Sequence, residues 1–459
     1  MRTIHRAEVV KFLYKWQWVP ILLTAPFFAF SKWMPLVPMV IVPGVWLAIW
    51  LAGGKPLVST PINLSILLIA LMVLVSVFVT YDLRISLGFL SGSVVGLAFY
   101  FLVVYYGKTS RGWWIIFLVF IGLATLISVV DALLISWPQK ISFLNPITSL
   151  LRTPLVSLPQ LSVPPHANNL PVLLLSVLPI QLALTGSFVI HRKELVRTIG
   201  SIRTNGLTLL TVVITVVNLL IFLLSQSRGG YISLALTCIF FLFAAASYRI
   251  RWILAAGLAV GSLMLYLLLS RGQASPLPAS IPGNPSDDTA LSTDTLEFRI
   301  EMWSRAIYGI QDFPFTGMGI NTFGHVMPKL YPLFTKSTDE FTNAHNTYLQ
   351  VALDLGIPGL IAFVALQLGA LGMWLKLWKT TRSSQSFSLE EHHLSPFHRL
   401  YFLEKGIVLG MGGVLLSQFL IGLTEANAMG TFLPVWVLIG LAAALYNQSQ
   451  APETRKDIS

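Results

Sequence analysis

The stretch LTLLTVVITVVNLLIFLLSQ occupies residues 207–226 and contains no charged side chain. About 20 apolar residues are needed for a helix to cross the hydrocarbon core of a bilayer, so this stretch predicts a membrane-spanning helix. The same bias holds for the whole chain of 459 residues, which is 55% hydrophobic and 11% charged, whereas soluble domains are about 25% charged. This composition excludes an ordinary soluble enzyme, a secreted disulfide scaffold and a disordered protein. It predicts an integral membrane protein.

Similar runs on both sides of this stretch predict an all-α polytopic membrane protein with about twelve transmembrane helices. Prolines interrupt the first two runs, so the count is open by two near the N-terminus. Two outer loops are too long to be simple turns, and the second half of the larger one has the pattern of a helix. The resulting division is 1–18 as a cytoplasmic or interfacial N-terminus, 19–269 as spans one to nine with an outer loop at 137–169, 270–345 as the large outer loop, 346–446 as spans ten to twelve, and 447–459 as a cytoplasmic tail.

The charged residues set the predicted orientation of the chain. There are 30 Lys and Arg residues against 19 Asp and Glu, a formal net charge of +11. In a soluble domain this excess would suggest binding to nucleic acid, but here most basic residues lie in short segments between apolar runs, where they act as topology signals. Those segments fall on the inner side if both termini are cytoplasmic. The single cysteine, Cys238, lies within an apolar run, which excludes an internal disulfide and a cysteine metal site.

Only one histidine, His345, opens an apolar helical pattern, in FTNAHNTYL at residues 341–349. Thr342 or Asn343 is expected to cap this helix, which places His345 in its first turn. The positive end of a helix disfavours an imidazolium, so His345 is expected to be neutral and able to accept a proton. The alternative interpretation is a capping or interfacial histidine. The apolar run that follows is too long for one straight span, and a break is expected at Pro358.

Two outer turns carry arginines that are candidates for binding an anion. Arg228 lies within SQSRGG at residues 225–230, between two predicted spans. The glycines of this turn expose backbone N–H groups before a helix, and together with the guanidinium they suit phosphate oxygens. The alternative interpretation is an arginine that reaches lipid headgroups. Arg84, which follows Asp82 in another outer turn, is a weaker second candidate.

The large outer loop is predicted to contain a helix that ends near Asp312. Its signals are a capping pair and an apolar stripe at helical spacing, namely Asp294, Glu297, Phe298, Met302 and Ile307. Arg299 and Arg305 also lie on this helix, and either could pair with Glu301. Such surface ion pairs are common and are not by themselves evidence of a site.

Three acidic residues lie in or near predicted spans: Asp131, Asp354 and Glu425. Ionisable groups inside a membrane are expensive to bury and are functional candidates by default. None of these three has an obvious basic partner within a span. Their roles are therefore left open at the level of the sequence.

Several short motifs follow one another in the second half of the chain. They are Ser227-Arg-Gly-Gly230, Arg299-x-x-x-Trp303-x-x-Ala306, Pro314-x-x-Gly-x-Gly319, His345-Asn-x-Tyr-Leu349 and Gly356-x-x-Gly359. Each is weak alone, but their order, the predicted outer position and the single large outer loop together resemble the bacterial O-antigen ligase/polymerase superfamily. The resemblance covers roughly residues 207–375. The first 200 residues match it only in hydropathy.

This resemblance implies an enzyme of the bacterial inner membrane with a GT-C-like helical fold and a periplasmic active site. Members take a glycan from undecaprenyl diphosphate and pass it to a lipid A core sugar, as ligases do, or to another lipid-linked glycan, as polymerases do. The implied partners are therefore a lipid-linked glycan donor, a glycan or lipid A-core acceptor and membrane lipid, with no nucleic acid. No metal and no cofactor are implied. Ligase and polymerase cannot be separated from the sequence.

The resemblance also assigns roles to individual residues. Arg228 and Arg299 would bind the diphosphate, and His345 would be the base or would orient the acceptor. Arg84 is a looser assignment to the diphosphate, since its motif match is poor. The secondary candidates for substrate binding are Arg305, Asn346 and Tyr348.

These roles agree with the chemistry of the residues themselves. A leaving diphosphate carries charge that two arginines can neutralise through bidentate hydrogen bonds. A sugar hydroxyl is a poor nucleophile, and a neutral histidine can take its proton. Direct displacement of the diphosphate would invert the anomeric centre.

The alternative function is a secondary transporter of a small anion such as bicarbonate. About twelve spans and one broken helix are compatible with it. The sequence shows no pair of broken helices in its two halves, however, which inverted repeats would require. A purely structural membrane protein is the third possibility, and it would tolerate substitution of Arg228, Arg299 and His345.

Overall fold

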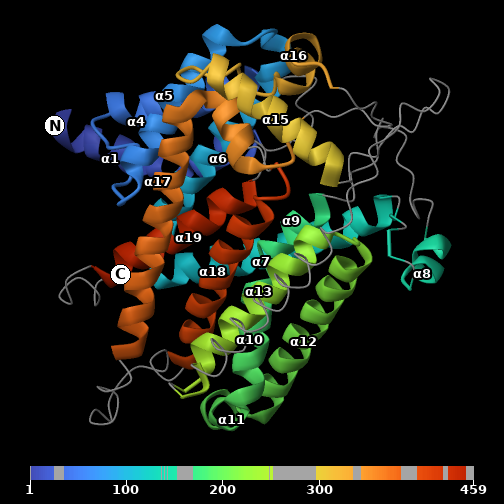
Figure 1. Cartoon of the computed structure of the whole chain (residues 1–459). Coiled ribbons are helices and arrows are strands. Elements are labelled where there is room, and N and C mark those ends of the chain that lie inside the picture. The colour runs from blue at the N-terminus through green and yellow to red at the C-terminus, as the bar shows by residue number, and fades with distance from the viewer. Residues whose placement is uncertain are drawn as a thin grey trace.

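The computed structural model is helical throughout the part of the chain that it describes (Figure 1). The described residues are 2–24, 36–135, 137–138, 140–141, 143–151, 169–247, 249–251, 296–333, 343–383, 401–426 and 433–450. The described helices are α1 (Arg2–Trp16), α2 (Trp18–Leu22), α4 (Leu36–Leu51), α5 (Asn63–Val79), α6 (Leu83–Tyr106), α7 (Ser110–Leu134), α8 (Asn145–Leu150), α9 (Asn169–Leu175), α10 (Leu178–Ile190), α11 (Arg192–Ile199), α12 (Ser201–Leu224), α13 (Arg228–Ala245), α15 (Leu296–Asp312), α16 (Phe323–Leu330), α17 (Thr347–Ser383), α18 (Tyr401–Ile421) and α19 (Leu433–Ser449).

Seven helical segments in the described part are long and apolar enough to cross a membrane, and three shorter helices are also apolar. The prediction of an all-α, multi-pass membrane protein is therefore confirmed. The predicted span at 252–269 and most of the one at 19–34 lie outside the described residues, so the total of twelve stays a prediction. The seven segments are Leu83–Tyr106, Ser110–Leu134, Asn169–Ile190, Ser201–Leu224, Arg228–Ala245, Thr347–Thr381 and Phe402–Ile421, and the shorter helices are Leu36–Leu51, Asn63–Val79 and Leu433–Ser449.

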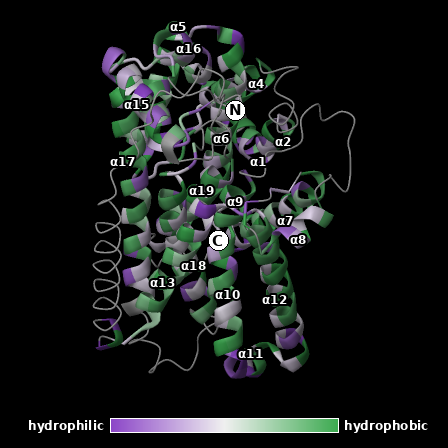
Figure 2. Cartoon of the chain, turned by 45° about the vertical axis from the view of Figure 1, so that its right-hand side comes forward, coloured by the Kyte–Doolittle hydropathy of each residue, from purple (hydrophilic) through white to green (hydrophobic). Residues whose placement is uncertain are grey.

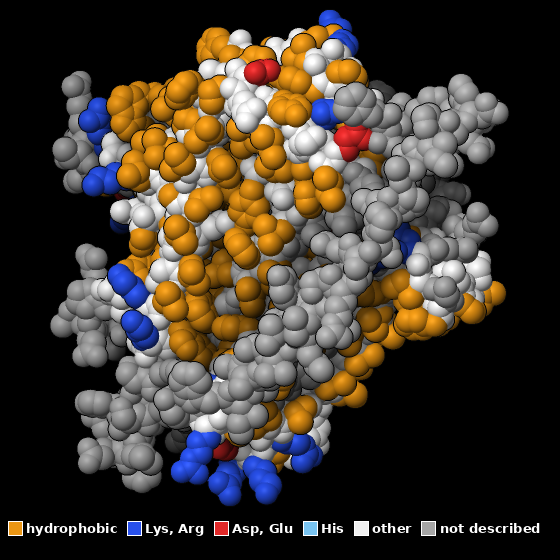
Figure 3. Space-filling view, in the orientation of Figure 1, with side chains coloured by type: hydrophobic (Ala, Val, Ile, Leu, Met, Phe, Trp, Pro, Cys, Tyr) orange, Lys and Arg blue, Asp and Glu red, His pale blue; other side chains and the backbone are white. Residues whose placement is uncertain are grey.

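The surface of the long helices is apolar, as contact with lipid requires. Figure 2 shows α10, α12 and α13 as largely hydrophobic along their length, with hydrophilic residues concentrated at α11. In Figure 3 the middle of the molecule is covered by hydrophobic side chains, and Lys and Arg side chains gather at the lower end, where Figure 1 places α11. The helices of the large outer loop, α15 and α16, lie at the opposite end (Figure 1). The orientation of the chain in the membrane stays a prediction.

The interior is built by close approach of helices around α17, α18 and α19. Glycines make this possible, because a side chain would collide with the neighbouring helix. A Cβ at Gly410 of α18 would lie 2.6 Å from the Cα of Ile180 on α10, and small residues at such crossings are typical of membrane helix packing. Elsewhere in the core, the Trp113 indole of α7 donates to the carbonyl of Leu441 on α19 at 2.9 Å. This bond satisfies the buried indole N–H inside the bundle.

Two of the seven segments are interrupted. In α17 the non-helical residue is Gly356, with φ 70° and ψ 178°, two residues before the break that the sequence places at Pro358. Pro358 instead occupies the first turn of the second half of α17, where its missing N–H costs nothing. The other interruption separates α9 from α10 at Ser176 and Val177. That second break was not predicted, although Pro179 lies in the first turn of α10, where a proline marks the start of a helix.

The helix predicted in the large outer loop is α15, and it ends at Asp312 as expected. Phe298 and Met302 are fully buried against α16 and the start of α17, as the predicted stripe requires. Ile307 is 46% exposed, and Ala306 takes its place in the buried stripe. The side chains of residues 294 and 297, to which the capping pair was assigned, lie outside the described part of the structure. That pair stays a prediction.

Candidate active site

Two side chains from distant parts of the sequence meet at the carboxylate of Glu425, in the loop after α18. One oxygen, Oε1, lies 3.5 Å from Nη2 of Arg299 on α15, and the other, Oε2, lies 3.4 Å from Nδ1 of His345. Arg299 and Glu425 are each 14% exposed and His345 is 15% exposed. We call these three residues the Glu425 cluster. It joins two of the predicted site residues to an acid whose partners the sequence did not reveal.

His345 lies immediately before α17 rather than in its first turn. Its backbone is in the left-handed region at φ 44°, and the helix is capped by the next residue, Asn346, whose Oδ1 accepts from the N–H groups of Tyr348 at 3.0 Å and Leu349 at 3.1 Å. Asn343 accepts from the His345 N–H at 3.0 Å, so it holds the turn but does not cap the helix. The expected caps were wrong because Asn346 lies closer to the first free N–H groups and can bond two of them.

The loop that carries Glu425 is fixed by hydrogen bonds from both sides. On the α17 side, Thr347 donates its N–H to Gly422 at 2.7 Å and its hydroxyl to the Glu425 carbonyl at 2.8 Å, and the Asn346 amide donates to Leu423 at 3.1 Å. On the α15 side, Nη1 of Arg299 donates to the Thr424 carbonyl at 2.7 Å. The cluster therefore has a rigid backbone beneath it, which a preorganised site needs.

The carboxylate determines which nitrogen of His345 is available for chemistry. A carboxylate can only accept hydrogen bonds, so the Nδ1 that faces Glu425 carries the proton. In the neutral ring the other nitrogen, Nε2, then holds the lone pair. An acid that orients a histidine and stabilises its protonated form is a recurring arrangement in general-base catalysis. Glu425 therefore orients the ring of His345 and favours its protonated form, an effect opposite to the one expected from the helix end.

Arg228 lies beside the same loop but has a different environment. It is the first residue of α13, and the Ser227 hydroxyl caps that helix by accepting from the Gly230 N–H at 3.1 Å. The next residue, Gly229, packs so closely on Thr424 that a Cβ there would collide with the threonine side chain. The side chain of Arg228 is exposed and makes no hydrogen bond or ion pair with the described residues. Its guanidinium is free to bind an anion near the Glu425 cluster.

Arg305 and Tyr348, two of the secondary candidates, make internal contacts. Arg305 is 8% exposed and donates to the Pro332 carbonyl at 3.2 Å. It also pairs with Glu301 at 3.5 Å, which is one of the two pairings that the sequence offered for Glu301. The hydroxyl of Tyr348 donates to Gln367 on the same helix at 3.2 Å. These contacts support the fold around the cluster.

Arg84 belongs to a different surface turn. Asp82 caps α6 by accepting from the Arg84 N–H at 2.9 Å, and the Arg84 side chain is exposed. The turn contacts α16 and the loop before it, through a hydrogen bond of 2.7 Å between Lys329 and Tyr81 and one of 2.7 Å from the Ser86 hydroxyl to the Ile320 carbonyl. Within the described part of the chain, no hydrogen bond or ion pair joins this turn to the Glu425 cluster.

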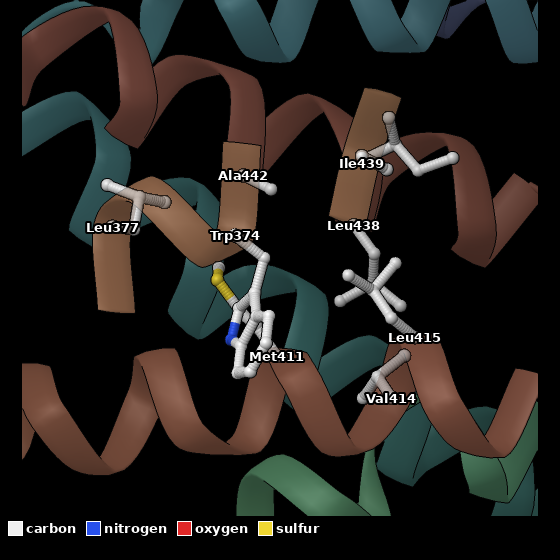
Figure 4. Close-up of a pocket in the computed structure, with 9 residues that line it drawn as sticks. Trp374, Leu377, Met411, Val414, Leu415, Leu438, Ile439 and Ala442 are labelled. Carbon is white, nitrogen blue, oxygen red and sulfur yellow. The ribbon is translucent and has the colours of Figure 1, made fainter. Parts of the chain in front are cut away.

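A separate pocket lies between α17, α18 and α19 and is shown in Figure 4. Its lining is entirely apolar apart from the Trp374 indole N–H, which already donates to the Val408 carbonyl at 2.7 Å. None of the candidate residues reaches it. It is a packing defect of the bundle and offers no group that could bind a charged substrate. Among the described residues, no three His, Cys, Asp or Glu side chains are arranged to hold a metal ion.

Glu425 is the functional candidate whose role sequence reasoning missed. The signal that was present is its position just beyond an apolar run, where an acid is unusual. The signal that was absent is its proximity to Arg299 and His345, which are 126 and 80 residues earlier in the chain. That proximity depends on how α15, α17 and α18 pack, and no local pattern encodes it.

The chain was compared with known protein families. A family model described as O-antigen ligase matches residues 212–364. The matched segment runs from α12 into α17 and includes Arg228, Arg299 and His345, whereas Glu425 lies beyond its end. A comparison with curated proteins found no match to the chain.

Proposed function

Residues 212–364 form an O-antigen ligase domain, which places the chain in the O-antigen ligase/polymerase superfamily of membrane glycosyltransferases, and on that premise we propose a specific reaction. The enzyme transfers a glycan from undecaprenyl diphosphate to a sugar hydroxyl at the periplasmic face of the bacterial inner membrane. The observation that carries this proposal is the Glu425 cluster with the exposed Arg228 beside it. The reaction requires a base, which Glu425 orients here, and a cation for the diphosphate, which the guanidinium of Arg228 supplies.

In the proposed step, Nε2 of His345 takes the proton of the acceptor hydroxyl as its oxygen attacks the anomeric carbon. The bond between that carbon and the diphosphate oxygen breaks, and the undecaprenyl diphosphate leaves with the electron pair. The attack comes from the face opposite the leaving group, so the anomeric configuration inverts. Glu425 stabilises the imidazolium that forms, in the manner of the acid in a catalytic triad.

The two arginines of the proposal have different contacts and therefore different shares of the work. Arg228 has no protein partner among the described residues and supplies hydrogen bonds to phosphate oxygens. Arg299 holds Glu425 and Thr424, so its first effect is to fix the base, and its positive charge adds to the attraction for the diphosphate. Arg84 would be a more distant contact for the same anion.

The experiment that tests the function uses the full-length protein in proteoliposomes with a lipid-linked glycan donor. A lipid A-core sugar and a second lipid-linked glycan are offered separately as acceptors, and release of undecaprenyl diphosphate is measured with product formation. We expect transfer to one acceptor, which also decides between ligase and polymerase. The second interrupted span, α9–α10, favours the transporter alternative, so uptake of labelled bicarbonate is measured in the same vesicles. Uptake without transfer to either acceptor would overturn the proposal.

Replacing Arg228 with alanine is expected to raise the donor KM by about 10–100-fold. A hydrogen bond to a charged group is worth about 1.5–3 kcal/mol, and about 1.4 kcal/mol corresponds to a factor of ten. The melting temperature should not change, because the exposed side chain makes no hydrogen bond or ion pair with the described residues. Steady-state kinetics in detergent micelles with varied donor measure the effect.

Arg197→Ala is the matched control, because Arg197 is an exposed arginine on α11 at the other end of the molecule. It should leave the donor KM unchanged. Arg84→Ala in the same assay tests whether that residue belongs to the donor site. An unchanged KM in Arg228→Ala would remove Arg228 from the proposal.

A further inference from the structure

The backbone of the described chain is strained at three positions that are not glycine. Gln226, Asn321 and His345 have φ values of 52°, 60° and 44°. Such conformations persist only where the surroundings enforce them, and they cluster at functional sites. Gln226 lies two residues before Arg228, and His345 is the proposed base. Asn321 lies in the loop between α15 and α16 and has no evident role in the reaction.

Two buried side chains connect Asn321 to His345. Oδ1 of Asp354 accepts from the Asn321 N–H at 3.0 Å and from Nε2 of Gln350 at 2.8 Å. Oε1 of Gln350 in turn accepts from the N–H of Ala344 at 2.9 Å, the residue directly before His345. Gln350 is 3% exposed and Asp354 is 8% exposed. The chain of contacts therefore runs from the loop, through the carboxylate and the amide, to the backbone of the proposed base.

The direction of these hydrogen bonds is fixed by the chemistry of the two side chains. A carboxylate has no proton to offer, so Gln350 must present its NH₂ group to Asp354. Its carbonyl oxygen is then turned toward Ala344, where it is the acceptor that a buried N–H needs. The Ala344 N–H can only donate, so it selects the same orientation of the amide from the other side. Asp354 and Ala344 thus hold the amide of Gln350 at both ends in one orientation.

The same short piece of helix is held at its other end by the loop that begins at Pro314. The N–H of Met318 donates to the Leu353 carbonyl at 2.6 Å, and the N–H of Ile357 donates to the Pro314 carbonyl at 2.7 Å. These bonds lie on either side of the break at Gly356, where the free carbonyl and N–H groups of α17 require partners. The loop, the break and Asp354 therefore form one unit that fixes residues 347–355.

We propose that Asp354 and Gln350 are positioning residues that hold His345 in its left-handed conformation and so aim its imidazole at the reaction centre. This inference rests on the proposed function, since it gives His345 the role of base. It also explains why a carboxylate is buried inside a membrane span without contacting the Glu425 cluster. Asp354 orients an amide, and the amide orients the backbone of the base.

We call the hydrogen bonds that link Asp354, Gln350 and the Ala344 N–H the relay. The experiment first disrupts the bond between Asp354 and Gln350 and then rebuilds it with the two side-chain types exchanged. Gln350→Glu places two carboxylates against each other and should lower kcat at least tenfold. In the double variant Gln350→Glu/Asp354→Asn, the new asparagine can donate to the new glutamate, and the glutamate still accepts from Ala344. The Asn321 N–H loses its acceptor, because the same oxygen of Asp354 holds both bonds. We therefore expect most, but not all, of the lost kcat to return. The donor KM should stay unchanged throughout, because Arg228 lies on a different helix.

A second readout follows His345 without requiring activity. The imidazole resonance of ¹³C-labelled histidine, assigned by its loss in His345→Ala, should shift in Gln350→Glu and return in the double variant. Gln367→Glu is the matched control, because it adds a carboxylate to the same helix outside the relay, where Tyr348 can still donate to it. This control should change neither kcat nor the His345 resonance.

Melting temperatures separate positioning from folding. If Gln350→Glu does not fold, Gln350→Met removes both hydrogen bonds without adding charge and should lower kcat and shift the same resonance. A folded Gln350 variant with normal kcat and an unshifted resonance overturns the relay, as does a folded double variant that recovers neither. If the unaltered protein transfers no glycan, the proposed function fails instead, and the resonance still reports whether the relay holds His345.

Discussion

His345→Ala is expected to lower kcat for glycan transfer by about 10²–10⁴-fold, the usual contribution of a general base. The expectation depends on Glu425, which lies 3.4 Å from Nδ1 and leaves Nε2 as the proton acceptor. The donor KM should change little, because the proposed diphosphate contact, Arg228, is on another helix. Single-turnover transfer from bound donor measures the chemical step apart from binding.

Two controls decide how this loss is interpreted. His325→Ala removes an exposed histidine of α16, which has no role in the proposal, and should keep full activity. Added imidazole should restore part of the activity of His345→Ala, because a small base can enter the space that the side chain leaves. Full activity in His345→Ala would show that the histidine is not the base and that the Glu425 cluster has another role.

The helices were predictable from the sequence wherever the periodic signal is long. Seven described segments have the length and apolarity of spans, and α15 ends where its apolar stripe ends. The prediction of Ile307 as a buried residue was wrong by one position. Phe298, Met302 and Ala306 are spaced four residues apart and lie on the buried face of the helix. The small alanine has too weak a hydropathy signal to identify it as the buried residue. Long apolar patterns therefore predict where a helix lies, whereas they predict less well which single side chain is buried.

Breaks and caps were less predictable, because several residues compete for each role. Pro358 is the more obvious helix breaker, yet the chain turns at Gly356, where φ of 70° is accessible to glycine without strain. Asn343, His345 and Asn346 are all polar residues near one helix start, and tertiary contacts decide which of them caps. Here the contacts from Asn346 to Leu423 and from Thr347 to Gly422 select Asn346. Local sequence contains none of that information.

Arg299→Met is expected to lower both stability and transfer, since it leaves the carboxylate of Glu425 in a largely buried place without its cation. Removing one partner of a buried pair costs about 3–5 kcal/mol for that reason. Replacing Glu425 with glutamine in the same chain removes the uncompensated charge. The double variant Arg299→Met/Glu425→Gln should therefore melt at a higher temperature than Arg299→Met alone. It should still be inactive, because His345 no longer faces a carboxylate.

The second Arg–Glu pair of α15 provides the comparison that separates stability from catalysis. Arg305 and Glu301 also lie 3.5 Å apart and are similarly shielded, with side chains 10% and 15% exposed, but they do not contact His345 in the described structure. Arg305→Met should lower the melting temperature to a similar degree, while the protein that remains folded keeps its kcat. Loss of kcat in folded Arg305→Met would make Arg305 part of the substrate site. Recovery of transfer in Arg299→Met/Glu425→Gln would instead show that the carboxylate does not orient the base, because stability and activity would then have returned together.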